Sequence, residues 1–348
     1  MQLTKNGYTD ADPRAVSRKK DHIELAFQSR VSADQLDPRF WYEPMLSAHP
    51  DQGTENPFPF LGKTMRVPIW VSSMTGGTAW AGIINHNLAR ACGEFGMGMG
   101  LGSCRSLLQS DEHLPDFDVR DAMGEEAPLF ANLGVAQLEQ LLDSGELGRV
   151  HDLLKKLRAD GLIIHVNPMQ EAMQPEGDRF IRSPLQIVSA FLEETRGEIL
   201  TVVKEVGQGM GPESIKALLE LPIAALDFGA SGGTNFALLE LLRNTPTAQQ
   251  TFGGLAQVGH TAEEMAHLVN ASLTELGDRQ QCPQIIASGG VKDFLDGYYL
   301  TQKIVLPTVY GQASAFLKHA RGDYEELRTF VHSQIEGLRL AKAFLRVR

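Results

Sequence analysis

Short runs of apolar and β-branched residues alternate with segments of helical periodicity along most of the chain. The segment at 83–95, for instance, repeats its apolar residues every three to four positions and predicts a helix after the first run. Eight strand–helix units between about residues 66 and 320 are the number found in a TIM (β/α)8 barrel. The runs that predict the strands are Val67–Ser73, Gly96–Gly102, Pro128–Asn132, Leu162–Asn167, Ile199–Glu205, Ile223–Phe228, Gln284–Ser288 and Ile304–Tyr310.

A doubly wound sheet is the alternative α/β architecture. It would place a GxGxxG turn after its first strand, whereas the first run here opens into Met74-Thr75-Gly76-Gly77. The pattern therefore predicts a TIM barrel over residues 66–348 that includes a C-terminal helix at Tyr324–Leu345, as a single domain overall. Residues 1–65 precede the barrel as an N-terminal arm and extension, with a helical stretch around Asp21–Gln28.

Charge and cysteine content narrow the class of protein. The 348 residues carry 43 acidic and 32 basic side chains, a formal net charge of −11. A chain this acidic binds nucleic acid poorly, because affinity for phosphate comes from Lys and Arg. Three cysteines without a CxxC pair favour a reducing compartment, and there is neither an apolar leader nor a run of about 18 apolar residues. We therefore expect a cytoplasmic protein with no nucleic-acid or membrane partner.

Small residues dominate three of the predicted strand ends. In a TIM barrel the chemistry lies at the C-terminal ends of the strands, and the last two loops commonly bind phosphate. The sequences at these ends are GASGGT at 229–234, SGG at 288–290 and GQAS at 311–314. Loops of this composition let backbone N–H groups approach an oxyanion. The alternative is that they are only tight turns that require glycine.

Three ionisable residues lie at or near strand ends. Lys204 ends an apolar strand, where an unpaired ammonium is costly; it points at an anion or forms a buried pair with Glu205 or Asp227. His165 lies inside a strand, as a site residue or a core histidine. Glu171 follows the same strand, either as a solvated loop acid or as the single carboxylate that Mg²⁺ prefers beside phosphate oxygens.

The N-terminal arm carries a short basic cluster, Arg18-Lys19-Lys20, in an otherwise acidic protein. It is either the solvated start of a helix or an arm that binds a diphosphate. An anionic ligand requires such local positive charge, because the chain as a whole repels anions.

Taken together, these motifs resemble the type 2 isopentenyl-diphosphate isomerases. The matching segments occur in the order of that family, and HVNPMQE followed by VKEVG is the most specific combination. The segments are RKKDH at 18–22, SSMTGG at 72–77, GSCR at 102–105, ANLG at 131–134, HVNPMQE at 165–171, VKEVG at 203–207, GASGGT at 229–234 and ASGG at 287–290.

The resemblance implies an FMN-binding TIM barrel that interconverts isopentenyl and dimethylallyl diphosphate in isoprenoid biosynthesis. It implies reduced FMN and Mg²⁺, NADPH as reductant, no net redox change, and a homo-oligomer, tetramer or octamer. The residues that would contact FMN are Ser72, Ser73, Met74, Thr75, Ser103, Asn132, Lys204, Gly229 and Thr234, with Gly289, Gly290, Val291, Ala313 and Ser314 at its phosphate.

The same resemblance assigns substrate, metal and catalytic residues. Glu171 would hold Mg²⁺. The residues that would meet the substrate are Arg18, Lys19, His22, Ser103, Arg105 and Gln170, and the catalytic group would be Gln170, His165, Asn167 and Lys204.

Two other functions remain to be compared. An FMN-dependent oxidoreductase of the lactate-oxidase or dihydroorotate-dehydrogenase type would require a substrate-carboxylate site, and the strand ends show no His/Arg pair for one. A flavin-binding protein without isomerase activity would be expected to lack Gln170, Glu171 or Arg18, and all three are present.

Overall fold

The computed structural model describes residues 15–51, 53, 56–74 and 76–348. The chain divides into two compact units, one of residues up to Trp41 with Arg348 and one of Tyr42–Val347. The first unit contains helix α1 (Ala15–Leu25), so the helix begins and ends earlier than the predicted stretch at Asp21–Gln28. The predicted domain boundary after residue 65 stays a prediction.

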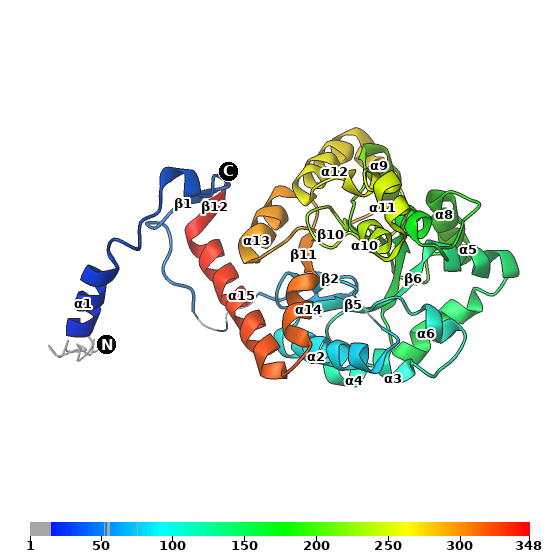
Figure 1. Ribbon diagram of the computed structural model, residues 1–348, viewed down its shortest axis with the longest axis horizontal. Helices are drawn as coiled ribbons and strands as arrows, with labels where there is room; N and C mark the ends of the chain where they lie inside the picture. The colour runs from blue at the N-terminus through cyan, green and yellow to red at the C-terminus, as the bar shows by residue number, and fades with distance from the viewer. Residues whose placement is uncertain (1–14, 52, 54–55, 75) are drawn as a thin grey trace. The chain divides into compact units, whose positions relative to one another are not determined.

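Eight parallel strands close into a barrel in the second unit, with helices around it (Figure 1). Each of the eight predicted runs overlaps one of these strands, which confirms the TIM barrel. The strands, in barrel order, are β10 (Ile285–Ser288), β11 (Thr308–Gln312), β4 (Ile69–Val71), β5 (Gly98–Gly100), β6 (Leu129–Gly134), β7 (Gly161–Val166), β8 (Thr201–Glu205) and β9 (Ala225–Asp227).

The last strand lies later in the chain than its predicted run, Ile304–Tyr310. Helix α13 continues to Lys303, and the N–H of Ile304 still donates to Leu300 O at 3.2 Å. Pro307, which has no N–H to donate, directly precedes β11. The apolar residues of the predicted run are therefore shared between the end of a helix, a loop and the strand.

Helices follow most of the barrel strands. Helix α2, for example, begins after Thr78, whose side chain accepts a hydrogen bond from Ala81 N, and ends at Gly96 in the left-handed region with φ of 71°. The helices are α2 (Ala79–Phe95), α3 (Leu114–Phe117), α4 (Arg120–Met123), α5 (Val135–Ser144), α6 (Gly148–Leu157), α7 (Pro168–Met173), α8 (Pro184–Glu194), α9 (Pro212–Leu219), α10 (Phe236–Arg243), α11 (Pro246–Phe252), α12 (Ala262–Leu276), α13 (Phe294–Lys303), α14 (Ser314–Ala320) and α15 (Tyr324–Phe344).

A hairpin closes the N-terminal end of the barrel. Strands β2 (Phe58–Phe60) and β3 (Lys63–Met65) pair antiparallel, and the backbone N–H of Leu61 between them donates to Gln284 Oε1 at 2.9 Å, directly before β10. Short strands β1 (Phe40–Tyr42) and β12 (Leu345–Val347) complete the structure. No helix in the described residues is long and apolar enough to cross a membrane.

Apolar side chains fill the barrel beside the hairpin. We call this cluster the apolar layer. It comprises Phe60, Leu61 and Met65 of the hairpin segment and Trp70, Phe130, Ile163, Val202, Ala225, Ile286 and Val309 of the barrel strands. The hairpin and the strands therefore share one hydrophobic core, and the C-terminal ends of the strands lie on the other side of this core.

We predict that Ile163→Ala destabilises the protein strongly. Ile163 is fully buried in the apolar layer, and truncating a buried isoleucine to alanine costs about 2–5 kcal/mol. Ile181→Ala is the matched control, because Ile181 is 93% exposed. Urea denaturation of both variants measures the free energies of unfolding, and equal losses in the two would contradict the prediction.

Candidate active site

Polar side chains lie directly above the apolar layer, at the C-terminal ends of the strands. Alternate residues of a strand point to the same side of a sheet. Trp70, Phe130, Ile163, Val202, Ala225 and Ile286 of the apolar layer are each followed, two positions later, by a polar residue. We call these residues the polar layer: Ser72, Asn132, His165, Lys204, Asp227 and Ser288.

Strand register places the charged members of the polar layer side by side. His165 on β7 pairs with Lys204 on β8, and Lys204 pairs with Asp227 on β9. All three belong to strands of 3–6 residues whose other inward positions are apolar or glycine. The fold thus brings together, as register neighbours, ionisable groups that lie 39 and 23 positions apart in the chain.

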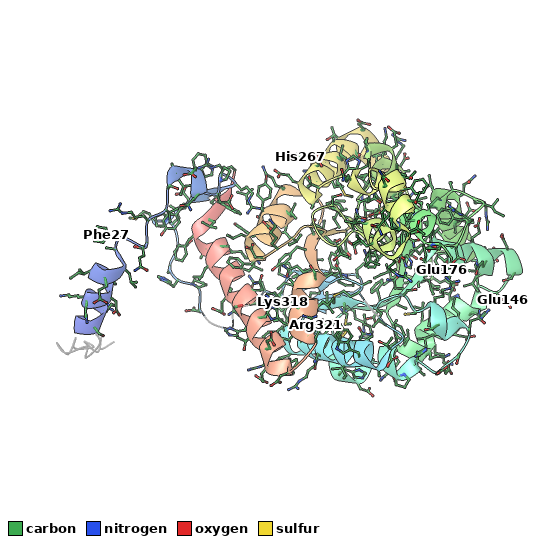
Figure 2. All side chains as sticks on the ribbon, in the orientation of Figure 1. Phe27, Glu146, Glu176, His267, Lys318 and Arg321 are labelled. Carbon is green, nitrogen blue, oxygen red and sulfur yellow. The ribbon has the colours of Figure 1, made fainter. Side chains whose placement is uncertain are left out.

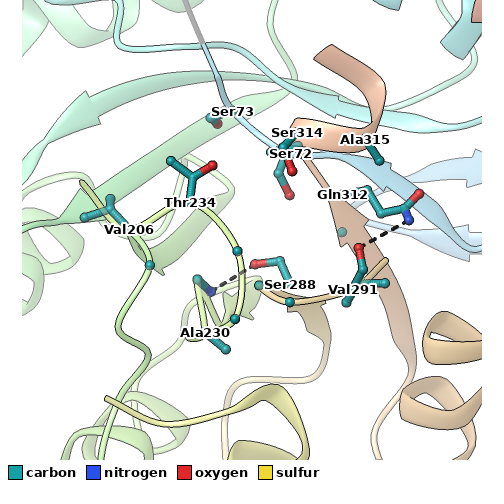
Figure 3. Close-up of a pocket in the computed structure, with 18 of the residues that line it drawn as sticks. Ser72, Ser73, Val206, Ala230, Thr234, Ser288, Val291, Gln312, Ser314 and Ala315 are labelled. Atoms are coloured by element: carbon teal, nitrogen blue, oxygen red, sulfur yellow. Dashed lines mark hydrogen bonds between the residues drawn. The ribbon is translucent and has the colours of Figure 1, made fainter. Parts of the chain in front are cut away.

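A cavity of about 390 Å³ opens above one side of the polar layer (Figure 3). It is lined by the ends of β4, β8, β9, β10 and β11 and by the loops that follow them. Its lining includes Ser72, Ser73, Lys204, Gly229, Thr234, Gly289, Gly290, Val291, Ala313 and Ser314, all predicted to contact FMN.

The loops at this cavity pack backbone against backbone. Gly289 and Gly290 have φ of 91° and 70°, and a Cβ on Gly289 would lie 2.1 Å from Ala230 O. Gly229 has φ of 51°, and a Cβ there would lie 1.9 Å from Glu205 O. Only glycine fits these positions, so the small residues serve both as turns and as a surface of exposed backbone.

Unpartnered polar atoms in the same cavity fit a polar cofactor. The hydroxyl groups of Ser72 and Ser73 and Oε1 of Gln312 are buried and have no hydrogen-bond partner among the described residues. The amide nitrogen of Gln312 donates to Val291 O at 3.4 Å (Figure 3). Buried polar groups are nearly always satisfied, and the flavin ring and phosphate of FMN carry matching donors and acceptors.

Two lysines at the cavity were not found from the sequence. Lys292 follows the Gly289-Gly290 loop, and Lys318 extends from α14, where Figure 2 labels it. Both are exposed side chains that line the cavity, and they supply local positive charge in an acidic protein. Neither has a sequence motif; Lys318 in particular is brought to the site only by the packing of α14.

A smaller cavity of about 110 Å³ adjoins the first. The two share Ser73, Lys204, Val206 and Phe236 in their linings. The smaller one is also lined by Met74, Gly102, Ser103, Asn132, His165 and Gln170. Predicted substrate and catalytic residues therefore meet next to the predicted cofactor residues, and Lys204 faces both.

His165 is held as a neutral ring with a defined tautomer. Asn132 Nδ2 donates to Leu101 O at 3.0 Å, so Asn132 Oδ1 is the acceptor for Nδ1–H of His165 at 2.7 Å. Nε2 then carries the free lone pair. Burial and, secondarily, the charge of Lys204 lower the pKa of His165 to about 4.

Lys204 forms no ion pair with Glu205 or Asp227 in the described part of the chain. Its ammonium donates to Glu205 O at 2.7 Å. The Glu205 carboxylate is used elsewhere: Oε2 accepts from the backbone N–H groups of Gly207, Gln208 and Gly209 at 2.6–2.9 Å. The sequence raised two alternatives for Lys204, an anion as its partner or a buried ion pair. The structure places the Lys204 ammonium at the two cavities, with Asp227 as its register neighbour in the polar layer.

Asn167 organises the two polar residues that follow it on α7. Its Nδ2 donates to Gln170 Oε1 at 3.1 Å and to Glu171 Oε1 at 2.9 Å, while Glu171 Oε2 accepts from Asp178 N at 2.7 Å. Asn167 is buried, and neither it nor Glu171 lines the two cavities. No group of three or more metal-ligating side chains occurs among the described residues. The Mg²⁺ site predicted at Glu171 stays a prediction.

The remaining predicted residues lie outside these cavities. Arg105 donates to Asp178 Oδ2 at 2.9 Å, and that oxygen also accepts from Gln137 Nε2 at 3.1 Å. Arg18, Lys19 and His22 lie exposed on α1, in the first unit. Thr75 lies outside the described residues. The roles of all the predicted site residues stay predictions.

Curated relatives identify the family. Isopentenyl-diphosphate delta-isomerase of Rickettsia felis is 31% identical over 334 residues, which cover 93% of this chain and 91% of that protein. The enzyme of the same name from a Synechococcus strain is 31% identical over 341 residues, with 95% and 92% covered. The chain belongs to the isopentenyl-diphosphate delta-isomerase family. The resemblance carried by the sequence motifs is thus confirmed, although no protein-family model matches the chain.

Solved structures similar to this member of the isomerase family share its fold. A flavocytochrome b2 variant with benzoylformate has a TM-score of 0.57 at 13% identity, covering 88% of this chain and 75% of that one. A mandelate oxidase variant with a monooxide FMN adduct has a TM-score of 0.52 at 12% identity, covering 89% and 88%. At this identity the likeness extends to the barrel alone.

The burial of His165 predicts a pH-dependent stability. The unfolded chain takes up a proton on this residue near pH 6.5, whereas the folded protein does so only near pH 4. The unfolded state therefore binds more protons between these values, and stability falls as the pH drops from 6.5 to 4, by up to about 3 kcal/mol. Above pH 6.5 the residue contributes no pH dependence.

His165→Gln should remove that part of the pH dependence, because glutamine can still donate to Asn132 but does not ionise. Urea denaturation of both proteins at pH 5 and pH 7 measures the difference. An NMR titration of the wild-type ring with a midpoint near 6.5 would contradict the assignment of a buried, neutral histidine.

Proposed function

We propose that this protein interconverts isopentenyl diphosphate and dimethylallyl diphosphate, with reduced FMN in the larger cavity, Mg²⁺ at Glu171 and NADPH as reductant. The observation that carries the proposal is the pair of adjoining cavities in an isomerase-family barrel, with Lys204 in both linings and His165 and Gln170 in the smaller one. The larger cavity has the glycine loops and unpartnered hydroxyl groups that a flavin phosphate and ring require.

Moving a carbon–carbon double bond by one position requires that one proton is added and another removed. An alkene is a weak base, so the proton donor must be close and water excluded. Reduced FMN, when bound in the larger cavity, would supply the acid–base group for this proton transfer. The chain's own contribution is the apolar layer beneath, the charge of Lys204 and the neutral ring of His165 at the wall.

Other polar residues in the proposal orient the substrate. Gln170 lines the smaller cavity, and its Oε1 is occupied by Asn167, so its amide N–H groups are presented to a ligand. Arg105 exchanges the Asp178 carboxylate for diphosphate oxygens in this proposal, since its guanidinium is 58% exposed and matches either anion. Arg18 and Lys19 add charge from the arm, with His22 beside them, and Ser103 adds a hydroxyl group.

The oxidoreductase alternative is less well supported. An enzyme that oxidises a hydroxy acid needs a cation for the substrate carboxylate next to the reacting histidine. In the smaller cavity the cation beside His165 is Lys204, so the lining alone does not separate the two reactions. The curated relatives at 31% identity, however, carry the isomerase name. We therefore favour the isomerase and extend the proposal to a homo-oligomer, tetramer or octamer, which sedimentation analysis tests directly.

FMN titration and product analysis test the proposal together. We expect one FMN per chain, and conversion of isopentenyl diphosphate only when the flavin is reduced and Mg²⁺ is present. Oxidised protein with lactate or dihydroorotate serves as the comparison. Absence of FMN binding at micromolar concentration, or reduction of the flavin by either of these acids without isomerisation, would overturn the proposal.

We predict that Glu171→Gln raises the Mg²⁺ concentration needed for half-maximal activity while FMN affinity stays unchanged. Glutamine keeps one acceptor oxygen, for Asn167 or for Asp178 N, and removes the charge that attracts the cation. Losing a hydrogen-bonded charge of this kind costs about 1.5–3 kcal/mol, or roughly tenfold or more in Mg²⁺ affinity.

Glu176→Gln is the matched control for that substitution. Glu176, labelled in Figure 2, is an exposed acid five positions further along the chain. A Mg²⁺ titration of activity compares the two variants with the wild type. If Glu171→Gln follows the wild-type curve, Glu171 does not hold the metal.

A further inference from the structure

Asp227 is a fully buried carboxylate of the polar layer that the proposed function does not use. It lies at the end of β9 with 0% of its surface exposed. Register places it between Lys204 on β8 and Ile286 on β10. A charge at such a position is costly unless other groups compensate it, so its neighbours indicate what it does.

One carboxylate oxygen of Asp227 connects the two glycine-rich loops. Ser288 Oγ donates a hydrogen bond to Asp227 Oδ1. The same hydroxyl oxygen accepts the backbone N–H of Gly229 at 2.9 Å, and Ala230 N donates to Ser288 O at 3.0 Å. Asp227 thereby holds Ser288, which joins the loop after β9 to the loop after β10.

The other oxygen, Asp227 Oδ2, is buried with no hydrogen-bond partner among the described residues. The ionisable groups around it are few. His165 across Lys204 stays neutral above pH 4 or so, and the Glu205 carboxylate is taken by the backbone of its own loop. Lys204 is therefore the cation of the polar layer in the described chain.

Electrostatics couples the two residues without direct contact. Burial raises the pKa of Asp227, while the charge of Lys204 and the hydrogen bonds of Ser288 and Gly229 oppose that rise. The coupling is reciprocal, because a charge that favours the carboxylate is itself favoured by it. Removing the carboxylate leaves the buried ammonium of Lys204 without a counter-charge.

We propose that Asp227 is a positioning residue that acts through Lys204 and Ser288. Its carboxylate is the negative charge next to the Lys204 ammonium at the boundary of the two cavities, and the hydrogen bond that it accepts from Ser288 holds the two glycine loops in register. As far as it concerns FMN, the inference rests on the proposed function.

Two substitutions separate these two actions. Asp227→Asn keeps an acceptor for Ser288 but removes the charge, so it tests the effect on Lys204. Ser288→Ala keeps the charge but removes the link to Gly229, so it tests the loops. Lys204→Met, alone and combined with Asp227→Asn, shows whether Asp227 acts through Lys204.

Asp160→Asn is the control for a partly buried carboxylate of structural function. Asp160 directly precedes β7 and accepts from Arg120 Nη2 at 2.7 Å and from Leu129 N at 2.9 Å. It lies at the end of the barrel away from the cavities. Its substitution should lower the free energy of unfolding and leave the properties of bound FMN unchanged.

The experiment compares the absorption spectrum of bound FMN and the dissociation constant for FMN among these variants at one pH. In Asp227→Asn we expect the spectrum to differ from that of the wild type, because the negative charge next to the Lys204 ammonium is gone. Asp227→Asn should cause no further change in the Lys204→Met background. Ser288→Ala should weaken FMN binding by about tenfold, the effect of one lost hydrogen bond, and leave the spectrum as in the wild type.

The outcomes distinguish this inference from the proposed function. If wild-type protein binds no FMN, the proposed function fails. If wild type binds FMN and Asp227→Asn gives the wild-type spectrum, or still changes the spectrum in the Lys204→Met background, the inference about Asp227 is wrong. Should Asp227→Asn fail to fold, Asp227→Ser takes its place in the same comparison, because it removes the same charge with a smaller side chain.

Discussion

The arrangement of the site depends on the cost of placing charge above an apolar core. The barrel interior is divided into two layers, and the boundary lies between Ile163 and His165 on β7 and between Val202 and Lys204 on β8. Below it, the described inward-facing side chains are apolar, and the indole N–H of Trp70 is a buried polar atom without a partner among them. Above it, each buried polar group must find a partner within the layer or from a ligand, and this requirement sets the tautomer of His165 and the surroundings of Asp227.

The same cost explains why some buried polar groups have hydrogen-bond partners within the described protein and others do not. Asn132 and His165 satisfy each other, and Glu205 is satisfied by three N–H groups of its own loop. In contrast, the hydroxyl groups of Ser72 and Ser73 remain unpartnered within the described protein. These hydroxyl groups face the larger cavity, as Figure 3 shows for Ser72. Asn132 and His165 at the smaller cavity are thus fixed by each other, while the hydroxyl groups at the larger cavity retain their hydrogen-bonding capacity, an arrangement suited to a cofactor of defined orientation.

Strand register makes the charged groups interdependent. His165, Lys204 and Asp227 are consecutive register partners on β7, β8 and β9, so the charge of each acts on the next. Lys204 lowers the pKa of His165 and opposes the rise in the pKa of Asp227. Membership of the family indicates the class of reaction. The electrostatic coupling of these groups, in contrast, follows from the strand register of this barrel.

The sequence by itself determined the architecture and the identity of many site residues. Eight apolar runs with helix-period segments between them predict a barrel, because strand and helix periodicities are local properties of the chain. The residues at the C-terminal ends of the predicted strands then include His165, Lys204 and the glycine-rich loops. Only the tertiary structure decided which groups face each other: that Lys204 lies between His165 and Asp227, that Ser288 joins two loops, and that Lys318 lines the cavity. These contacts form between strands and helices that are far apart in sequence, and a local sequence pattern carries no information on which of them become neighbours. Burial then determines the protonation and the hydrogen bonding of the groups that the barrel brings together.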